Sequence, residues 1–346
     1  MCELELPGDA RVALSHAAAY GLAAILDDAS VAGVTVAWTS SLDARAVVDA
    51  PGLDPDGIAH VVLEHARRHA GPGSWTAATA DVGDTTVGRL SPRVRAPADD
   101  AAWAELARLR RESLDGETAG RRWLDLAMIG ALGEPAYWRF DAQGKRRPDE
   151  GASRWEMKTR NRGEDFVQHR LHRLAVSVAA RDVVGVRDGL LGIAVEDEAG
   201  GNAPDSRSGT GLGGLGPVDN ALAWCALWGF SLLPVVARTG RPSESAGHGS
   251  VRPAGGPRQT WFHLPVPTRP VTLARLATIL ASEQLATVAA AHALPGDDGD
   301  LGARSAREWL IDRGVGGVVR FPIGVFGSAS APERRALLGS VVRLAP

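Results

Sequence analysis

The sequence predicts a mixed α/β fold of the α+β kind, rich in helices and distinct from the classical doubly wound dinucleotide fold. Segments with helical periodicity cover many more residues than segments with strand-like alternation. The expected strands do not alternate regularly with helices, as a parallel sheet requires. A glycine-rich motif that imitates a dinucleotide loop lacks the strand that should precede it.

The N-terminal third combines helices with a few short strands. The amphipathic segment that begins after Asp54 carries a helix-capping residue and is stopped by Gly-Pro-Gly. Residues 34–40 alternate as a strand does, and short strands and turns are expected between residues 75 and 97. The predicted helices here cover residues 12–29, 54–70, 99–116 and 121–138.

The rest of the chain is also expected to contain both helices and strands. Residues 163–181 predict a long helix with a basic first half, and residues 189–198 a strand or loop. Asp219 is expected to cap a helix that runs into a short buried strand by residue 238. The remaining predicted elements are a strand at 259–267, a helix at 272–285 and a helix followed by a strand at 305–326, with polar or glycine-rich loops at 199–217 and 239–258.

Length and charge leave the domain organisation open. The 346 residues, 45% of them hydrophobic, are enough for one large core or two modest ones. Residues 1–120 carry 10 basic and 18 acidic groups, whereas residues 121–181 carry 13 and 8. We therefore expect either an acidic N-terminal region 1–120 followed by a region 121–346 with a basic patch, or one continuous domain.

The cysteines and the N-terminus favour a cytoplasmic protein. Cys2 and Cys225 are too few for a disulfide framework, and Cys225 lies in an apolar run typical of a core. The first residues are acidic and lack the pattern of a secretory signal. No run of 18 apolar residues predicts a membrane span.

The motif G-x-G-x-x-G at Gly209, Gly211 and Gly214 is the only hint of a dinucleotide. The nearest plausible strand ends at Val195, and a polar loop intervenes, so the fingerprint lacks its context. No cofactor is expected. Two alternatives remain: a flexible loop before a buried helix, or a loop whose glycines let the backbone approach a phosphodiester chain.

Two clusters of chemistry-bearing residues have the composition of catalytic or metal sites. His65 and His69 are four residues apart, but the glutamate that a zinc protease needs after the first histidine is absent, so we expect a solvated helix face and no metal. Asp149, Glu156 and Lys158 imitate the PD-(D/E)xK signature of metal-dependent nucleases. The short spacing between the two carboxylates argues against the strand hairpin that this chemistry uses, and nuclease activity stays an alternative function.

The middle of the chain favours a nucleic-acid-binding surface. Basic residues at this density suit phosphates, and the interleaved Trp155 and Phe166 could stack on bases. A solvated helix, balanced by Glu164 and Asp165, is the alternative. The candidate contacts of this segment are Arg154, Lys158, Arg160, Asn161, Arg162, Gln168, Arg170 and Arg173.

The two loops around residues 218–238 are further candidates, because recognition residues concentrate on loops held by a rigid scaffold. The first loop offers Asn202, Arg207, Ser208 and Thr210 among its glycines. The second offers Ser243, Ser245 and His248. We expect at least one of them to enter a groove of a target duplex.

Three segments in this order resemble a known family. They are "LSHAAAYGLAAIL" with the strand "VTVAWTS", the central "RWEMKTRNRGEDFVQHRL", and "GPVDNALAWCALWGFSLLPV" followed by "WFHLPVP". The chain is similar in outline to the large-subunit-like proteins of type I CRISPR effector complexes (Cascade), particularly type I-G, formerly I-U. It differs in His16 and in a run of alanines where bulkier residues are common, and it is shorter than the largest members.

The resemblance implies a subunit without catalytic activity in an RNA-guided surveillance complex of antiviral defence. Such a subunit contacts the guide RNA, reads a short motif on double-stranded DNA beside the guide-paired segment, and recruits a helicase-nuclease. Its partners are the guide, the target DNA and the other subunits of the complex. Pairing with the guide then reads the sequence, while the protein reads the adjacent motif.

Overall fold

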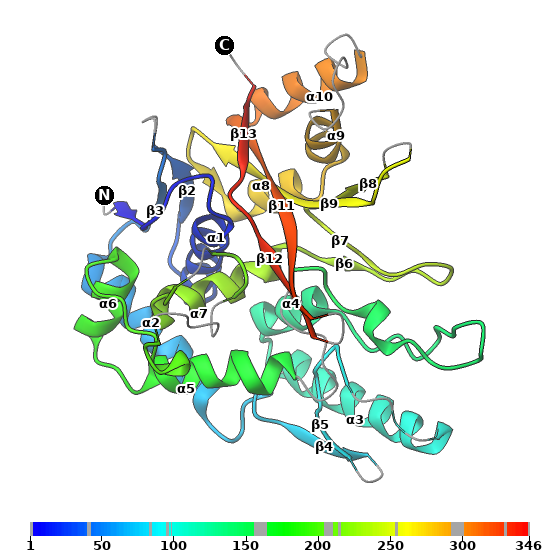
Figure 1. Ribbon diagram of the computed structural model, residues 1–346. Helices are drawn as coiled ribbons and strands as arrows, with labels where there is room; N and C mark the ends of the chain where they lie inside the picture. The colour runs from blue at the N-terminus through cyan, green and yellow to red at the C-terminus, as the bar shows by residue number, and fades with distance from the viewer. Residues whose placement is uncertain are drawn as a thin grey trace.

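The computed structural model describes residues 3–39, 43–82, 85–94, 97, 99–155, 165–203, 210–213, 216–252, 255–291, 301–328 and 331–344. Helices dominate this part of the chain (Figure 1). Its α-helices are α1 (Ala13–Asp28), α2 (Pro55–Ala70), α3 (Asp100–Ala119), α4 (Trp123–Leu132), α5 (Arg173–Ala179), α6 (Val183–Leu191), α7 (Asn220–Trp228), α8 (Leu273–Leu280), α9 (Glu283–Ala291) and α10 (Leu301–Asp312). Shorter helical turns are η1 (Pro148–Gly151), η2 (Val167–His172), η3 (Glu198–Gly200) and η4 (Gly229–Leu232).

Two antiparallel sheets flank the central helices. The first has the strand order β1 (Glu3–Glu5), β3 (Ala46–Asp49), β2 (Thr35–Trp38) and β10 (Val271–Thr272). The second has the order β12 (Ala331–Ala336), β11 (Val315–Ser328), β9 (Gln259–Pro267) and β8 (His248–Val251), and β13 (Ser340–Arg343) also pairs with β11. Helices α9 and α10 pack against this second sheet near the C-terminus (Figure 1).

Two short hairpins complete the strands that the structure describes. Strands β4 (Thr79–Val82) and β5 (Thr85–Gly88) pair with each other and pack with α3 around a small core that includes Trp103 and Leu106. Strands β6 (Val235–Val236) and β7 (Glu244–Ser245) form the other hairpin. Both hairpins lie outside the two larger sheets.

Helices α1 and α7 cross at the centre of the main core, and two glycines make the crossing possible. A Cβ at Gly21 of α1 would lie 2.5 Å from the amide nitrogen of Gly229 and closer still to the carbonyl oxygen of Cys225. A Cβ at Gly229 would in turn collide with the carbonyl oxygen of Ala17. The backbones therefore touch directly, which explains why both helices consist largely of small residues and are buried nearly all round.

The prediction of a helix-rich α+β fold is confirmed, since helices outnumber strands and every strand pair in the described residues is antiparallel. Most of the predicted helices and the strands at 34–40 and 259–267 are present within a few residues. The carboxylates of Asp54 and Asp219 accept backbone N–H bonds at the starts of α2 and α7, as predicted. No described helix is both long and apolar enough to cross a membrane.

Residues 189–198, predicted as a strand or a loop, begin with the last turn of α6, which extends to Leu191, and continue as a loop as far as Asp197. Two local predictions were wrong. The loop predicted at 239–258 contains β7 and β8, which pair with the sequence-adjacent strands β6 and β9 in two antiparallel hairpins. The segment after α7 forms the turn η4 before the two-residue strand β6, and Val236 is half-exposed rather than buried.

Candidate nucleic-acid interface

One face of the second sheet packs on the core. Beyond the edge of the core, the same face carries basic side chains. His248 of β8 lies opposite Phe262 of β9, and residues opposite each other in an antiparallel pair point to the same face. Arg334 of β12 lies two residues from the buried Ala336 and opposite Val325, so it also points to that face. Both side chains are half-buried.

The backbone of Arg154 is fixed on the same face by its neighbour. Trp155 stacks on Phe262 with ring centroids 3.8 Å apart, and its indole Nε1 donates to the carbonyl of Ala246 at 2.7 Å. The amide of Arg154 donates to the hydroxyl of Ser245 at 2.8 Å. The residues that hold Arg154 in place therefore come from β7, from the turn before β8 and from β9.

Two further arginines approach from other segments. Arg93 follows the β4–β5 hairpin, and the hydroxyl of Ser91 donates to the Arg93 carbonyl at 3.0 Å. The buried Arg110 of α3 anchors this turn by donating to the carbonyl of Ser91 at 2.9 Å. Arg258 precedes β9 and is exposed. We call Arg93, Arg154, His248, Arg258 and Arg334 the basic cluster.

Burial and the positive charges of the basic cluster lower the pKa values of two of its members, Arg154 and His248. Burial, together with the positive charges of Arg334 and Arg93, lowers the pKa of Arg154. Burial and the charges of Arg154, Arg334 and Arg258 lower the pKa of His248 to about 4. His248 is therefore neutral at pH 7, and the four guanidinium groups remain charged, since arginine does not lose its proton in this range.

Two carboxylates act against this lowering of the pKa values of Arg154 and His248. Each of them already binds an arginine outside the basic cluster. Glu150, whose charge raises the pKa of Arg154, accepts a bond of 2.6 Å from Arg139. Glu244, whose charge raises the pKa of His248, accepts a bond of 2.7 Å from Arg238. Glu150 and Glu244 are therefore shared with arginines outside the basic cluster.

Such a group of guanidinium forks suits an anion with several oxygens. Arginine binds phosphate oxygens in pairs, and a neutral histidine beside them can donate or accept one further bond. Arg258 is exposed and Arg154, His248 and Arg334 are half-buried, so a surface ligand can reach them. A row of phosphates, as in a nucleic-acid backbone, fits a cluster of this kind better than one isolated anion does.

The structure separates the residues predicted from sequence to bind nucleic acid. Arg154 belongs to the basic cluster. Along η2 and α5, Gln168 is half-buried, Arg170 is buried and Arg173 is exposed beside a separate shallow cavity near Arg181. Six of the predicted contacts lie outside the described residues: Lys158, Arg160, Asn161, Arg162, Arg207 and Ser208.

The described residues of the two predicted recognition loops have mainly local contacts. The side chain of Asn202 accepts a bond of 2.6 Å from the amide of Asp197, and Thr210 is buried and accepts one from the amide of Leu212. In the second loop, Ser243 is buried, and Ser245 and His248 lie against the segment that carries Arg154. The second loop thus contributes to the basic cluster.

The histidines of α2 form part of the core, so the prediction of a solvated face was wrong for His65 and His69. Both rings pack on Trp224 and Trp228 of α7, with centroid distances between 4.5 and 5.7 Å. The Nε2 atom of His69 lies 2.6 Å from a carboxylate oxygen of Asp125 in α4. Within the described ranges no group of three or more His, Cys, Asp or Glu is placed to hold a metal ion.

The alternative nuclease motif is only partly described. Asp149 lies in the 3₁₀ turn η1, where the carbonyl of the preceding Pro148 accepts a bond from the amide of Ala136. The other two members of the motif, Glu156 and Lys158, lie outside the described residues.

Sequence reasoning missed Arg93, Arg258 and Arg334. No short-range pattern joins them to Arg154, because they lie in segments up to 241 residues apart. The only signal was the alternation of β12, which places Arg334 on the same face as the apolar Ala336. We compared the chain with known proteins, and no family model, curated protein or solved structure matches it.

Proposed function

We propose that this protein is a nucleic-acid-binding subunit without a catalytic role, and that the basic cluster holds the sugar-phosphate backbone. The observation that carries the proposal is the meeting of Arg93, Arg154, Arg258 and Arg334 from four distant segments. Guanidinium groups gathered from several segments can each donate two parallel bonds to phosphate oxygens, and their combined field attracts an anionic backbone.

The sequence resemblance supplies the setting. In this proposal the chain belongs to an RNA-guided surveillance complex of the type I CRISPR class, beside the guide RNA and the other subunits. It contacts target DNA next to the guide-paired segment and recruits the helicase-nuclease. The small-residue helices α1 and α7, whose sequences contribute to the resemblance, form the rigid centre from which the second sheet carries the basic cluster.

Binding of the purified full chain to labelled single-stranded and double-stranded oligonucleotides, measured over a series of salt concentrations, tests the proposal. The double variant Arg154→Gln/Arg334→Gln should bind more weakly to every sequence. The slope of log K against log salt should fall by about two units, one for each lost phosphate contact. Circular dichroism and urea unfolding establish that the variant keeps its fold.

The matched control is Arg67→Gln/Arg108→Gln, which removes the same charge from two exposed arginines on α2 and α3. Both already bind glutamates on their own helices, so affinity and slope should stay at the wild-type values. Equal losses in the two double variants would mean that net charge alone attracts the nucleic acid. Unchanged binding in the Arg154/Arg334 variant would refute the role of the basic cluster.

The proposed setting has its own test. The gene for this chain is co-expressed with its neighbouring genes, and any complex is purified through a tag on this chain. A complex that contains a short guide RNA supports the surveillance function. Purification of this chain without RNA or protein partners under those conditions contradicts it.

A further inference from the structure

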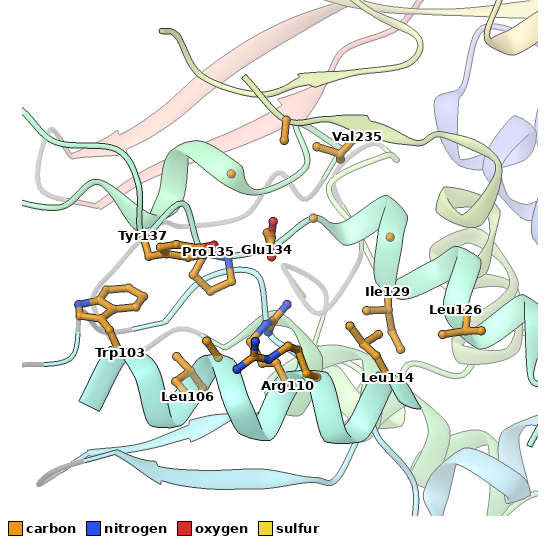
Figure 2. A pocket seen from close by; sticks show the side chains of 16 residues that line it. Trp103, Leu106, Arg110, Leu114, Leu126, Ile129, Glu134, Pro135, Tyr137 and Val235 are labelled. Atoms are coloured by element: carbon orange, nitrogen blue, oxygen red, sulfur yellow. The ribbon is translucent and has the colours of Figure 1, made fainter. Parts of the chain in front are cut away.

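A cavity of about 400 Å³ lies between α3, α4 and the segment that follows α4 (Figure 2). This volume is within the range of small-molecule sites. Most of its wall is apolar, from Leu106 and Leu114 of α3 to Leu126 and Ile129 of α4. A flat heterocycle is the class of ligand that such a wall accepts, provided that polar groups meet its edge.

One end of the cavity is aromatic. Figure 2 shows Trp103 of α3 and Tyr137 there, with Pro135 beside Tyr137. Trp103 is buried in the small core of α3, whereas 48% of Tyr137 is exposed, so a ligand can approach over the tyrosine. Aromatic faces of this kind stack on unpaired bases.

Three charged residues line the cavity: Glu134, Arg110 and the exposed Arg111. Glu134 is exposed and lies between the aromatic end and Ile129 in Figure 2, and its side chain makes no hydrogen bond or ion pair with any described residue. Arg110 lies on the α3 side, and burial lowers the pKa of its guanidinium to about 10, so that it stays charged at pH 7. Its Nη1 binds the carbonyls of Arg89 and Ser91 and is thus held in place.

A carboxylate that makes no hydrogen bond within the described part of the protein, placed at a base-sized cavity, selects among the bases by their hydrogen-bonding edges. A carboxylate only accepts hydrogen bonds, and its two oxygens can take two parallel donors. Guanine offers two adjacent donors, N1–H and the 2-amino group, on its Watson–Crick edge. Adenine, cytosine and thymine have no two adjacent donors on that edge, since the single donor of each stands beside an acceptor that the charge of Glu134 repels.

The cavity and the basic cluster are built in part on the same segments of the chain. Gly151 lines the cavity, and Arg154 follows three residues later in the same segment. Arg110 lines the cavity and binds Ser91, whose hydroxyl in turn binds the carbonyl of Arg93. The loop that carries Glu134 is joined to this segment by the Gly133–Ala152 bridge and by the bond of 2.9 Å from the Ser153 amide to the Leu132 carbonyl.

We propose that this cavity receives one unpaired guanine base of the strand whose phosphates the basic cluster binds, with stacking on Tyr137 and pairing to Glu134. The inference rests on the proposed function, because the basic cluster must hold the strand. It adds a sequence preference that the guanidinium groups alone do not provide.

Four single-stranded probes test it. They are thymidine 12-mers that carry at the centre one guanine, one inosine, one adenine or no substitution. The full chain should bind the guanine probe about tenfold more tightly than the adenine or all-thymidine probe, the effect expected of a two-bond base contact. The inosine probe, which lacks the 2-amino group, should fall between them.

Variants separate the cavity from the basic cluster. Glu134→Gln should abolish the preference for guanine and leave the affinity for the all-thymidine probe unchanged. Tyr137→Ala should weaken the binding of the guanine probe because stacking is lost. Tyr137→Phe keeps the aromatic face and should leave that affinity unchanged. The control Glu105→Gln changes an exposed glutamate of α3 that binds Arg108, and it should keep the preference. Equal affinity for all four probes, with the salt dependence retained, would overturn the guanine site and leave the proposed function standing. Absence of binding to every probe would overturn both.

Discussion

Replacing Gly21 by alanine tests whether the backbone contact between α1 and α7 holds the core together. The added methyl would lie 2.5 Å from the amide nitrogen of Gly229 and closer to the carbonyl oxygen of Cys225. Ordinary contacts of a methyl group begin near 3.4 Å. The two helices would have to separate by about 1 Å or more, because neither obstacle is a side chain that can rotate away.

The expected cost follows from that displacement. A gap of about 1 Å forfeits a quarter to a half of the attraction between the facing atoms. Alanine also favours a helix by about 1 kcal/mol over glycine, which offsets part of the loss. We expect a net destabilisation of about 3 kcal/mol, at the upper end of overpacking costs, because both helices are buried nearly all round.

Urea unfolding followed by tryptophan fluorescence measures this cost, since Trp224 and Trp228 lie on α7. The matched control is Gly116→Ala in α3, where a Cβ meets nothing within 4 Å and the glycine is exposed. That change should stabilise the protein by up to about 1 kcal/mol. If Gly21→Ala is as stable as the wild type to within about 0.5 kcal/mol, the close backbone crossing is refuted.

Three more predictions concern buried polar groups. Asp125→Asn should cost about 3 kcal/mol in urea unfolding, because this buried carboxylate accepts bonds from both His69 and Trp75. A cost below about 1 kcal/mol would contradict this buried hydrogen-bond network. Arg181 donates to both oxygens of the Asp219 carboxylate, so a double-mutant cycle with Arg181→Gln and Asp219→Asn should give a coupling above about 1 kcal/mol, whereas simple additivity would exclude it. Burial lowers the pKa of His16 to about 4, below the value of about 6.5 in an unfolded chain. As the pH falls, the unfolded state therefore takes up the proton before the folded state does. His16 should remove about 1.4 kcal/mol of stability per pH unit between about pH 6 and 4. Equal urea midpoints at about pH 7 and about pH 5 would refute the burial of this ring.

The local elements of the fold could be predicted from the sequence because their signals act over a few residues. Asp54, Asp99 and Asp219 each accept an amide bond within three residues and begin a helix. The small-residue character of α1 and α7 was also visible, as was the alternation of β9. Asp182 caps α6 by the same short-range bond, so that helix was missed although its signal was present.

The partners of these elements were decided only by the tertiary structure. Strand β8 exists because β9 pairs with it, and the sequence of β8 alone resembles a loop. His65 and His69 lie on a helix whose sequence is compatible with water, but α7 covers their face. A side chain becomes buried when a distant segment packs over it, and no pattern within one helix specifies that segment.

In the candidate site, too, some features could be predicted from the sequence and others only from the tertiary structure. The sequence determined that Arg154 lies in a basic stretch and that Trp155 beside it is a large apolar side chain. Only the fold brought Arg93 and Arg334 to Arg154 and placed Glu134 beside the cavity of Tyr137. Helix caps and strand alternation depend on bonds between near neighbours, whereas the sum of charges at one point depends on how all the segments pack.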